Sequence, residues 1–200
     1  MSFFPDFTLW QLVCTGLIFT WSGFVRSGLG FGGAALGLPL MLFVYDKPVF
    51  WIPVIGTHLL FFSGLTLSNR LHNVDWRYLY KSGKLILPAA IAGVFGLINL
   101  PNEILLLLIY GITLIYAIIW VLGKSIKTQS PALDSLLLLF GGYVSGATLT
   151  GAPLMIAVFM RNVAISQLRD TMFFLWFIIV SIKIFTLLLF EVPLNLSSAL

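Results

Sequence analysis

Charged side chains are scarce in this chain of 200 residues, and their scarcity excludes an ordinary water-soluble domain. Only 9% of the residues are Asp, Glu, Lys or Arg, and 60% are hydrophobic; a soluble domain has roughly 25% charged residues. The mean hydropathy is +1.05. We therefore expect an all-α, polytopic integral membrane protein.

Other absences exclude further classes of protein. The single cysteine, Cys14, rules out an internal disulfide, a Cys-rich metal site and a CxxC redox pair. The net charge is +4, but the basic residues are dispersed among apolar stretches and form no stripe with aromatic residues, so no nucleic-acid partner is expected. HExxH, GxSxG and Walker motifs are missing as well, so neither an enzyme nor a cofactor is predicted.

Eight apolar stretches divide the chain, at residues 8–25, 28–45, 49–68, 84–100, 104–122, 133–147, 150–161 and 171–190. The third, fourth, fifth and eighth meet or approach the ~20 residues of a full membrane span. The sixth and seventh are short, and the second begins with the glycine-rich sequence SGLGFGGAALG. The polar stretch 68–84, with Trp76, Tyr78 and Tyr80, is predicted to be an interfacial helix.

The basic residues between these stretches predict an orientation. Nine of them lie in the first, third, fifth and seventh gaps, and only Lys47 lies in an even gap. Lys and Arg in short loops are retained on the cytoplasmic side. We expect the N-terminus outside a bacterial inner membrane, with residues 68–84 in the cytoplasm. The N-terminal sequence MSFFPDF has no basic residue, which is unlike a secretory leader.

Two segments of the chain resemble one another weakly. GGAALGLPLML (32–42) matches TGAPLMIAVFM (150–160), and GTHLLFF (56–62) matches DTMFFLW (170–176), which places Thr57 opposite Thr171. Counting spans puts the two motifs at opposite membrane faces, as in an inverted repeat. We predict a first repeat at 1–123, a cytoplasmic linker at 124–134 and a second repeat at 135–200. Stretches four and five have no counterpart after the eighth, so the second repeat is expected to be incomplete.

The glycine-rich motifs are candidates for anion binding. Glycine lets backbone N–H groups approach a ligand closely, and the N-terminus of a helix favours an anion. The first motif contains Gly28, Gly30, Gly32 and Gly33. The second, SGATLTGAP, adds the hydroxyls of Ser145, Thr148 and Thr150 beside Gly151. Close packing of membrane helices is the alternative role for such small residues.

Two titratable residues lie inside apolar stretches. Lys183 interrupts FFLWFIIVSIKIFTLLLF, where an ammonium facing lipid would cost about 3 kcal/mol; either it faces protein, water or a bound anion, or it snorkels. His58 in IGTHLLFF could bind substrate or relay protons, with burial in a satisfied environment as the alternative. Arg169 and Asp170 are expected to form a salt bridge on the cytoplasmic side.

These features together resemble the TauE/SafE family of sulfite and organosulfonate exporters. The resemblance covers about 16–190 and depends on SGLGFGGAALGLPLML, on GATLTGAPLMIAVF and on Gln167 to Thr171. It implies a bacterial inner-membrane carrier of sulfur-containing or related small organic anions. In the second motif, TLTGAP stands where the family usually has a fuller glycine triplet.

From the sequence we predict a secondary transporter whose two interrupted segments face one another around a small anion, with the lipid bilayer as its environment. The predicted substrate-binding residues are Gly32, Gly33, Thr57, His58, Thr150, Gly151, Thr171 and Lys183. A homo-oligomer is one way to complete the site. A non-transporting scaffold, in which the glycines only permit packing, is the main alternative, and an intramembrane enzyme is the weaker one.

Overall fold

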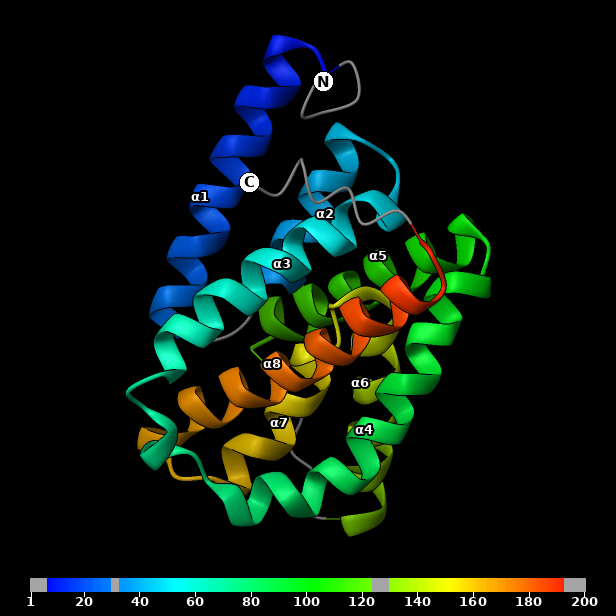
Figure 1. Cartoon of the computed structure of the whole chain (residues 1–200). Coiled ribbons are helices and arrows are strands. Elements are labelled where there is room, and N and C mark those ends of the chain that lie inside the picture. Colours follow the sequence, from blue (N-terminus) through cyan, green and yellow to red (C-terminus); the bar gives the residue numbers. More distant parts are fainter. Residues whose placement is uncertain (1–6, 30–32, 124–129, 193–200) are drawn as a thin grey trace.

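Helices make up the whole of the regular structure in residues 7–29, 33–123 and 130–192, which are the residues that the computed structural model describes. They are α1 (Leu9–Leu29), α2 (Gly33–Val44), α3 (Pro48–Leu67), the short 3-10 helix η1 (Leu71–Asn73), α4 (Trp76–Asn99), α5 (Asn102–Val121), α6 (Pro131–Thr148), α7 (Ala152–Asn162) and α8 (Ile165–Leu189). Figure 1 shows their arrangement. The predictions of an all-α fold and of eight apolar segments are confirmed.

The helices differ in their capacity to cross a membrane. Within the described residues, α3, α4, α5 and α8 are long and apolar enough to span it, and they are the four segments for which the sequence predicted a full span. Helices α2 and α7 have 12 and 11 residues. At 1.5 Å per residue they extend only about 16–18 Å, against about 30 Å for the hydrocarbon core of a bilayer. They are therefore half-spans.

Two predicted boundaries need correction. Helix α4 begins at Trp76, so residues 76–84 are its first turns and not a separate interfacial helix. The side chain of Asp75 caps this helix by accepting a hydrogen bond from the Tyr78 N–H at 2.9 Å, and a count of apolar residues misses such a polar start. Helix α6 begins at Pro131, so residues 131–134 of the predicted linker are helical. Residues 124–129 lie outside the described part of the chain.

The closest helix contact is between α4 and α6. A Cβ on Gly146 would collide with the backbone oxygen of Ala90, and one on Gly93 would collide with that of Tyr143. A Cβ on Gly142 would lie 2.6 Å from the backbone oxygen of Ile86. Glycine is required at these three positions because backbone, which cannot move aside as a flexible side chain can, occupies the space. The small residues of this pair serve helix packing.

Each half-span folds back along the helix before it. The Cβ of a residue replacing Gly33 would lie 2.9 Å from the backbone oxygen of Ser22 in α1. In the other hairpin, a Cβ on Gly151 would collide with the backbone oxygen of Gly141 in α6. The chain thus contains two long–short hairpins, α1–α2 and α6–α7. Each is followed by a long helix.

Those long helices, α3 and α8, pack in opposite directions. Gly56 of α3 faces Val180, and Gly64, two turns later, faces Phe177, which precedes Val180 in α8. Figure 1 shows the two helices passing across the front of the molecule. Their contact connects the two hairpins.

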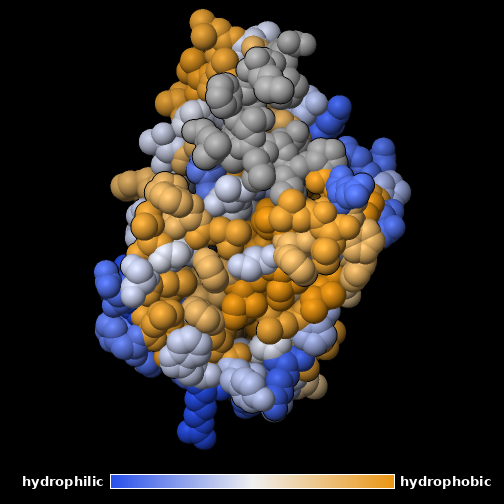
Figure 2. All heavy atoms as spheres, in the orientation of Figure 1, coloured by the Kyte–Doolittle hydropathy of each residue, from blue (hydrophilic) through white to orange (hydrophobic). Residues whose placement is uncertain are grey.

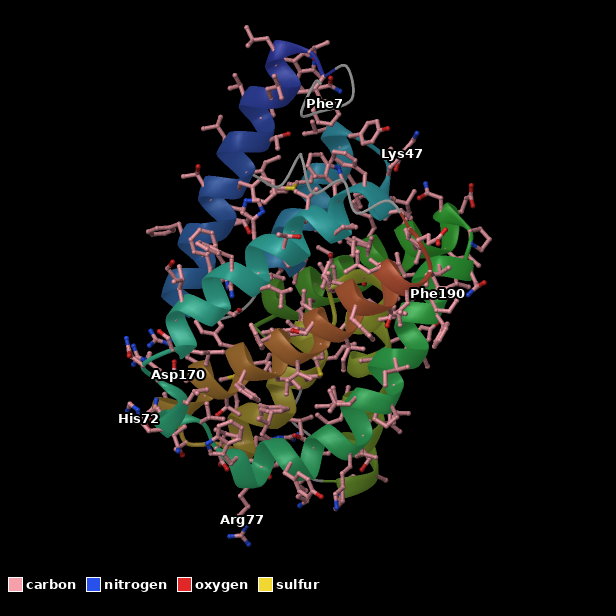
Figure 3. All side chains as sticks on the ribbon, viewed as in Figure 1. Phe7, Lys47, His72, Arg77, Asp170 and Phe190 are labelled. Carbon is pink, nitrogen blue, oxygen red and sulfur yellow. The ribbon has the colours of Figure 1, made fainter. Side chains whose placement is uncertain are left out.

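Polar residues gather at the ends of the molecule. Figure 2 shows a hydrophobic belt across the middle with hydrophilic residues mostly beyond it. In Figure 3, Lys47 and Phe190 lie toward one end, and His72, Arg77 and Asp170 lie toward the other. Helix α2 ends three residues before Lys47, whereas Phe159, near the end of α7, contacts Tyr78 beside Arg77. The two half-spans therefore point toward opposite ends.

We predict that Gly146→Ala destabilises the protein. Its methyl group would collide with the Ala90 carbonyl, and such overpacking costs about 1–3 kcal/mol. Thermal unfolding of detergent-purified protein measures the effect. The matched control is Gly111→Ala in α5, where an added Cβ meets nothing within 4 Å. Equal melting temperatures for the two variants would contradict the packing assignment.

The orientation is predicted to put Glu103 outside and Arg77 in the cytoplasm. Both side chains are exposed, and the basic residues gather toward the Arg77 end. In a Cys14→Ala background, an impermeant maleimide applied to intact cells should label Glu103→Cys, and it should label Arg77→Cys only after lysis. The reverse pattern would invert the assignment.

Candidate functional site

The connection between α6 and α7 brings polar groups together inside the protein. Leu149 adopts a φ of 66°, a left-handed conformation that is uncommon for residues other than glycine, and the chain reverses there. The hydroxyl oxygens of Thr148 and Thr150 lie 2.7 Å apart. Ser145, Thr148 and Thr150 are each at most 1% exposed. We call this region, residues 145–151, the second link.

Lys183 of α8 extends to the second link. Its Nζ donates a hydrogen bond to the Ser145 carbonyl oxygen at 2.9 Å, and the residue is 0% exposed. It therefore faces the protein interior and not lipid. Among the described residues no carboxylate forms an ion pair with it. A buried ammonium without an opposite charge is costly, so this lysine needs a reason other than stability.

A second group of polar residues lies between α1, α2 and α3. A cavity of about 260 Å³ is bordered there by Ser22, Arg26, Ala34 and His58, among others. The guanidinium of Arg26 donates to the Ser63 hydroxyl and to the Leu59 carbonyl oxygen, and it lies 4.9 Å from the centre of the Phe173 ring. We call this the Arg26 cavity.

Only some of the predicted site residues come together. Lys183, Thr150 and Gly151 lie at or beside the second link, whereas His58 borders the Arg26 cavity. Gly33 starts α2 against Ser22 and Arg26. Gly32 lies outside the described residues. The Thr57 hydroxyl donates to the Pro53 carbonyl of its own helix at 3.0 Å, and no hydrogen bond joins it to another helix in the described part of the chain.

Thr171 belongs to a different set of contacts, at the start of α8. Its hydroxyl accepts a hydrogen bond from the Asp75 N–H at 2.9 Å. The neighbouring Asp170 is 0% exposed and accepts from Arg70 at 3.2 Å, Asn73 at 2.6 Å and Arg169 at 3.4 Å. The expected Arg169–Asp170 salt bridge is confirmed, and these contacts clamp α8 to the segment before α4.

The two glycine-rich starts pack on different helices. The nearest neighbours of Gly33 are in α1, and those of Gly151 are in α6. Ala35 and Ala152, close to the two starts, belong to one hydrophobic cluster. That both starts line one shared cavity stays a prediction.

Sequence reasoning missed the partners of three charged residues. Arg26 is one of the nine basic residues that served only to predict the orientation, and its contact with Ser63, 37 residues away, has no local signal. Two of the hydrogen-bond donors to the Asp170 carboxylate, Arg70 and Asn73, lie 100 and 97 residues earlier in the chain. Lys183 was identified because charge is rare in an apolar helix, although its partner Ser145 was not.

Half-spans that begin at small-residue motifs, with full spans around them, are features of a polytopic membrane protein. The profile of the family described as sulfite exporter TauE/SafE matches residues 15–200. The chain therefore belongs to the TauE/SafE family. Comparison with curated proteins and with solved structures gave no significant match. Family membership implies a membrane transporter of sulfur-containing anions.

We predict that Asp170→Asn destabilises the fold. The substitution removes the charge that Arg70 and Arg169 share, and hydrogen bonds to a charged group contribute about 1.5–3 kcal/mol; both arginines are partly exposed, which lowers the loss. Thermal unfolding should show a lower midpoint than for Glu103→Gln, a control at an exposed carboxylate. A midpoint equal to that of the control would show that the clamp adds nothing to stability.

Proposed function

We propose that this chain is a secondary transporter that carries sulfite, an organosulfonate or a related small anion through the membrane. The observation that carries the proposal is Lys183, which is fully buried at the second link without an acidic partner among the described residues. Membership of the TauE/SafE family supports the substrate class. The proposal places the protein in a bacterial inner membrane with its N-terminus outside.

The second link offers suitable groups for an anion. An ammonium has three N–H donors, and the Ser145 carbonyl accepts one of those of Lys183. The Thr148 and Thr150 hydroxyl oxygens lie 2.7 Å apart, and the Thr148 hydroxyl also lies within donating distance of the Val144 carbonyl oxygen, at 2.9 Å. The Thr150 proton is free for a ligand when Thr148 donates to Thr150 in place of Val144. A sulfur oxyanion presents several acceptor oxygens to such donors, and its charge offsets the buried ammonium.

Alternating access would come from movement of one repeat against the other. The moving units are the proposed repeats 1–123 and 135–200, each with a hairpin of one long and one short helix followed by a long helix. The half-spans α2 and α7 begin part-way through the molecule and point toward opposite ends. A site between them would open to one side at a time.

A scaffold without transport activity is the second candidate. The glycines at the α4–α6 contact favour it, because backbone contacts fully account for Gly93, Gly142 and Gly146. Packing does not account for Lys183. Measurement of radiolabelled sulfite, sulfonate or thiosulfate flux in proteoliposomes separates the two candidates.

We predict that Lys183→Met lowers anion flux by about tenfold or more while expression stays normal. Removal of a charged hydrogen-bond donor costs about 1.5–3 kcal/mol, and 1.4 kcal/mol is a factor of ten. Methionine keeps the length of the side chain and removes the charge. Parent and variant should be compared in the same vesicle preparation, at equal protein content.

The control for this experiment is Lys81→Met, at an exposed lysine near the start of α4. It removes a positive charge without touching the second link, so flux should be retained. Unchanged flux in Lys183→Met at equal protein content would remove Lys183 from the site. Absence of flux for every anion in the parent would sink the transport proposal itself.

A further inference from the structure

The Arg26 cavity contains a cation with unused donors. A guanidinium has five N–H donors, and the two hydrogen bonds that the structure gives to Arg26 both use Nη2. One goes to a hydroxyl and the other to a carbonyl. No carboxylate in the described part of the chain forms an ion pair with it. Its charge is therefore uncompensated at the edge of a cavity large enough for a small oxyanion.

His58 borders the same cavity from α3. Its Nδ1 lies 3.0 Å from the Val54 carbonyl oxygen. Because a carbonyl only accepts, Nδ1 must carry the proton of the neutral ring, and Nε2 is the nitrogen that gains or loses a proton. The centre of the Phe19 ring lies 4.8 Å from that of the imidazole, within cation–π range, whereas that of Phe62 lies 6.5 Å away, just beyond it. Aromatic rings near a cation stabilise it.

Few other charged groups lie close enough to His58 to influence its protonation. Helix α1 brings Arg26 to the cavity, and α2 has no titratable residue. His58 is the only titratable residue of α3 itself. The titratable residues of the other helices that pack on α3 do not border the cavity: Glu103, Tyr110 and Tyr116 of α5, and Arg169, Asp170 and Lys183 of α8.

We infer that the Arg26 cavity is a second anion site, separate from the second link, in which Arg26 and protonated His58 together bind a small oxyanion. The charge of Arg26 is permanent, and the charge of His58 depends on pH. Anion binding and protonation of His58 then favour each other, because coupling between two ligands is reciprocal. An anion held there brings a proton with it. This inference deepens the proposed function by naming a route for proton coupling, and it rests on that function only for its transport consequence.

Binding to purified protein tests the site without transport. Methanesulfonate is a suitable probe because its charge is constant from acid to mildly alkaline pH. Its affinity should be measured by calorimetry at about pH 5.5 and about pH 8, either side of the range in which histidine usually titrates. The parent should bind about tenfold more tightly at the lower pH.

The variants separate the two charges. His58→Gln should keep the affinity of the parent at the higher pH and lose its pH dependence, whereas the control His72→Gln, at an exposed histidine, should behave as the parent does. Arg26→Gln should weaken binding about tenfold or more at both pH values, and Arg26→Lys should restore part of it.

A variant that keeps both charges covers the case in which Arg26→Gln fails to fold. Ala34→Leu fills the cavity from α2 and should abolish binding there, whereas Lys81→Met, at an exposed lysine, should leave it intact. Three results would each overturn the inference: no binding by the parent, an unchanged pH dependence in His58→Gln, or undiminished binding in Ala34→Leu. Displacement of methanesulfonate by phosphatidylglycerol but not by free sulfate would also overturn it, because the site would then belong to a lipid headgroup.

The outcome is distinguishable from failure of the proposed function. If the parent transports anions and Lys183→Met does not, but binding is independent of His58, the transport proposal stands and this inference falls. If the site binds as described but no anion crosses the vesicle membrane, the inference on the site stands and transport falls.

Discussion

The contact between α4 and α6 fixes the place of the second link. Backbone meets backbone at Gly93, Gly142 and Gly146, and an apolar environment offers little hydrophobic drive for association, so close packing must supply the attraction. Ser145 and Thr148 lie on α6, the same helix as Gly142 and Gly146. The second link, and with it the start of α7, is therefore held by a contact that tolerates no side chain.

In the described part of the chain, two cations inside the protein have no acidic partner: Lys183, which is fully buried, and Arg26, which is partly buried. Lys183 is enclosed completely and bonded to a carbonyl, and Arg26 interacts with neutral groups at a cavity. Burial of a charge without an opposite charge lowers stability, and helices could pack equally well around methionine or leucine. Two such residues next to two chain reversals are easier to understand as binding groups than as structural ones.

Much of the architecture could be predicted from the order of apolar residues, and almost none of the contacts could. The lengths of the apolar runs identified α3, α4, α5 and α8 as spans, because the length of such a run is a local property of the chain. The start of α4 was missed because the Asp75 cap is polar. Apart from the neighbouring Arg169–Asp170 pair, the partners of Arg26, Asp170 and Lys183 lie 33 to 100 residues away, and hydropathy carries no information on such pairs.

The contact between α3 and α8 relates the two groups of polar residues to each other. His58 lies on α3, two residues after Gly56, and Lys183 lies on α8 next to Ile184, one of the residues that Gly56 contacts. Gly56 and Gly64 of α3 bring no side chain to this contact, whereas the backbone contacts of α4 and α6 oppose any sliding. If an anion passes between Arg26 and Lys183, α3 and α8 are the helices able to move past one another, and the two proposed repeats would pivot about the α4–α6 contact that holds them together.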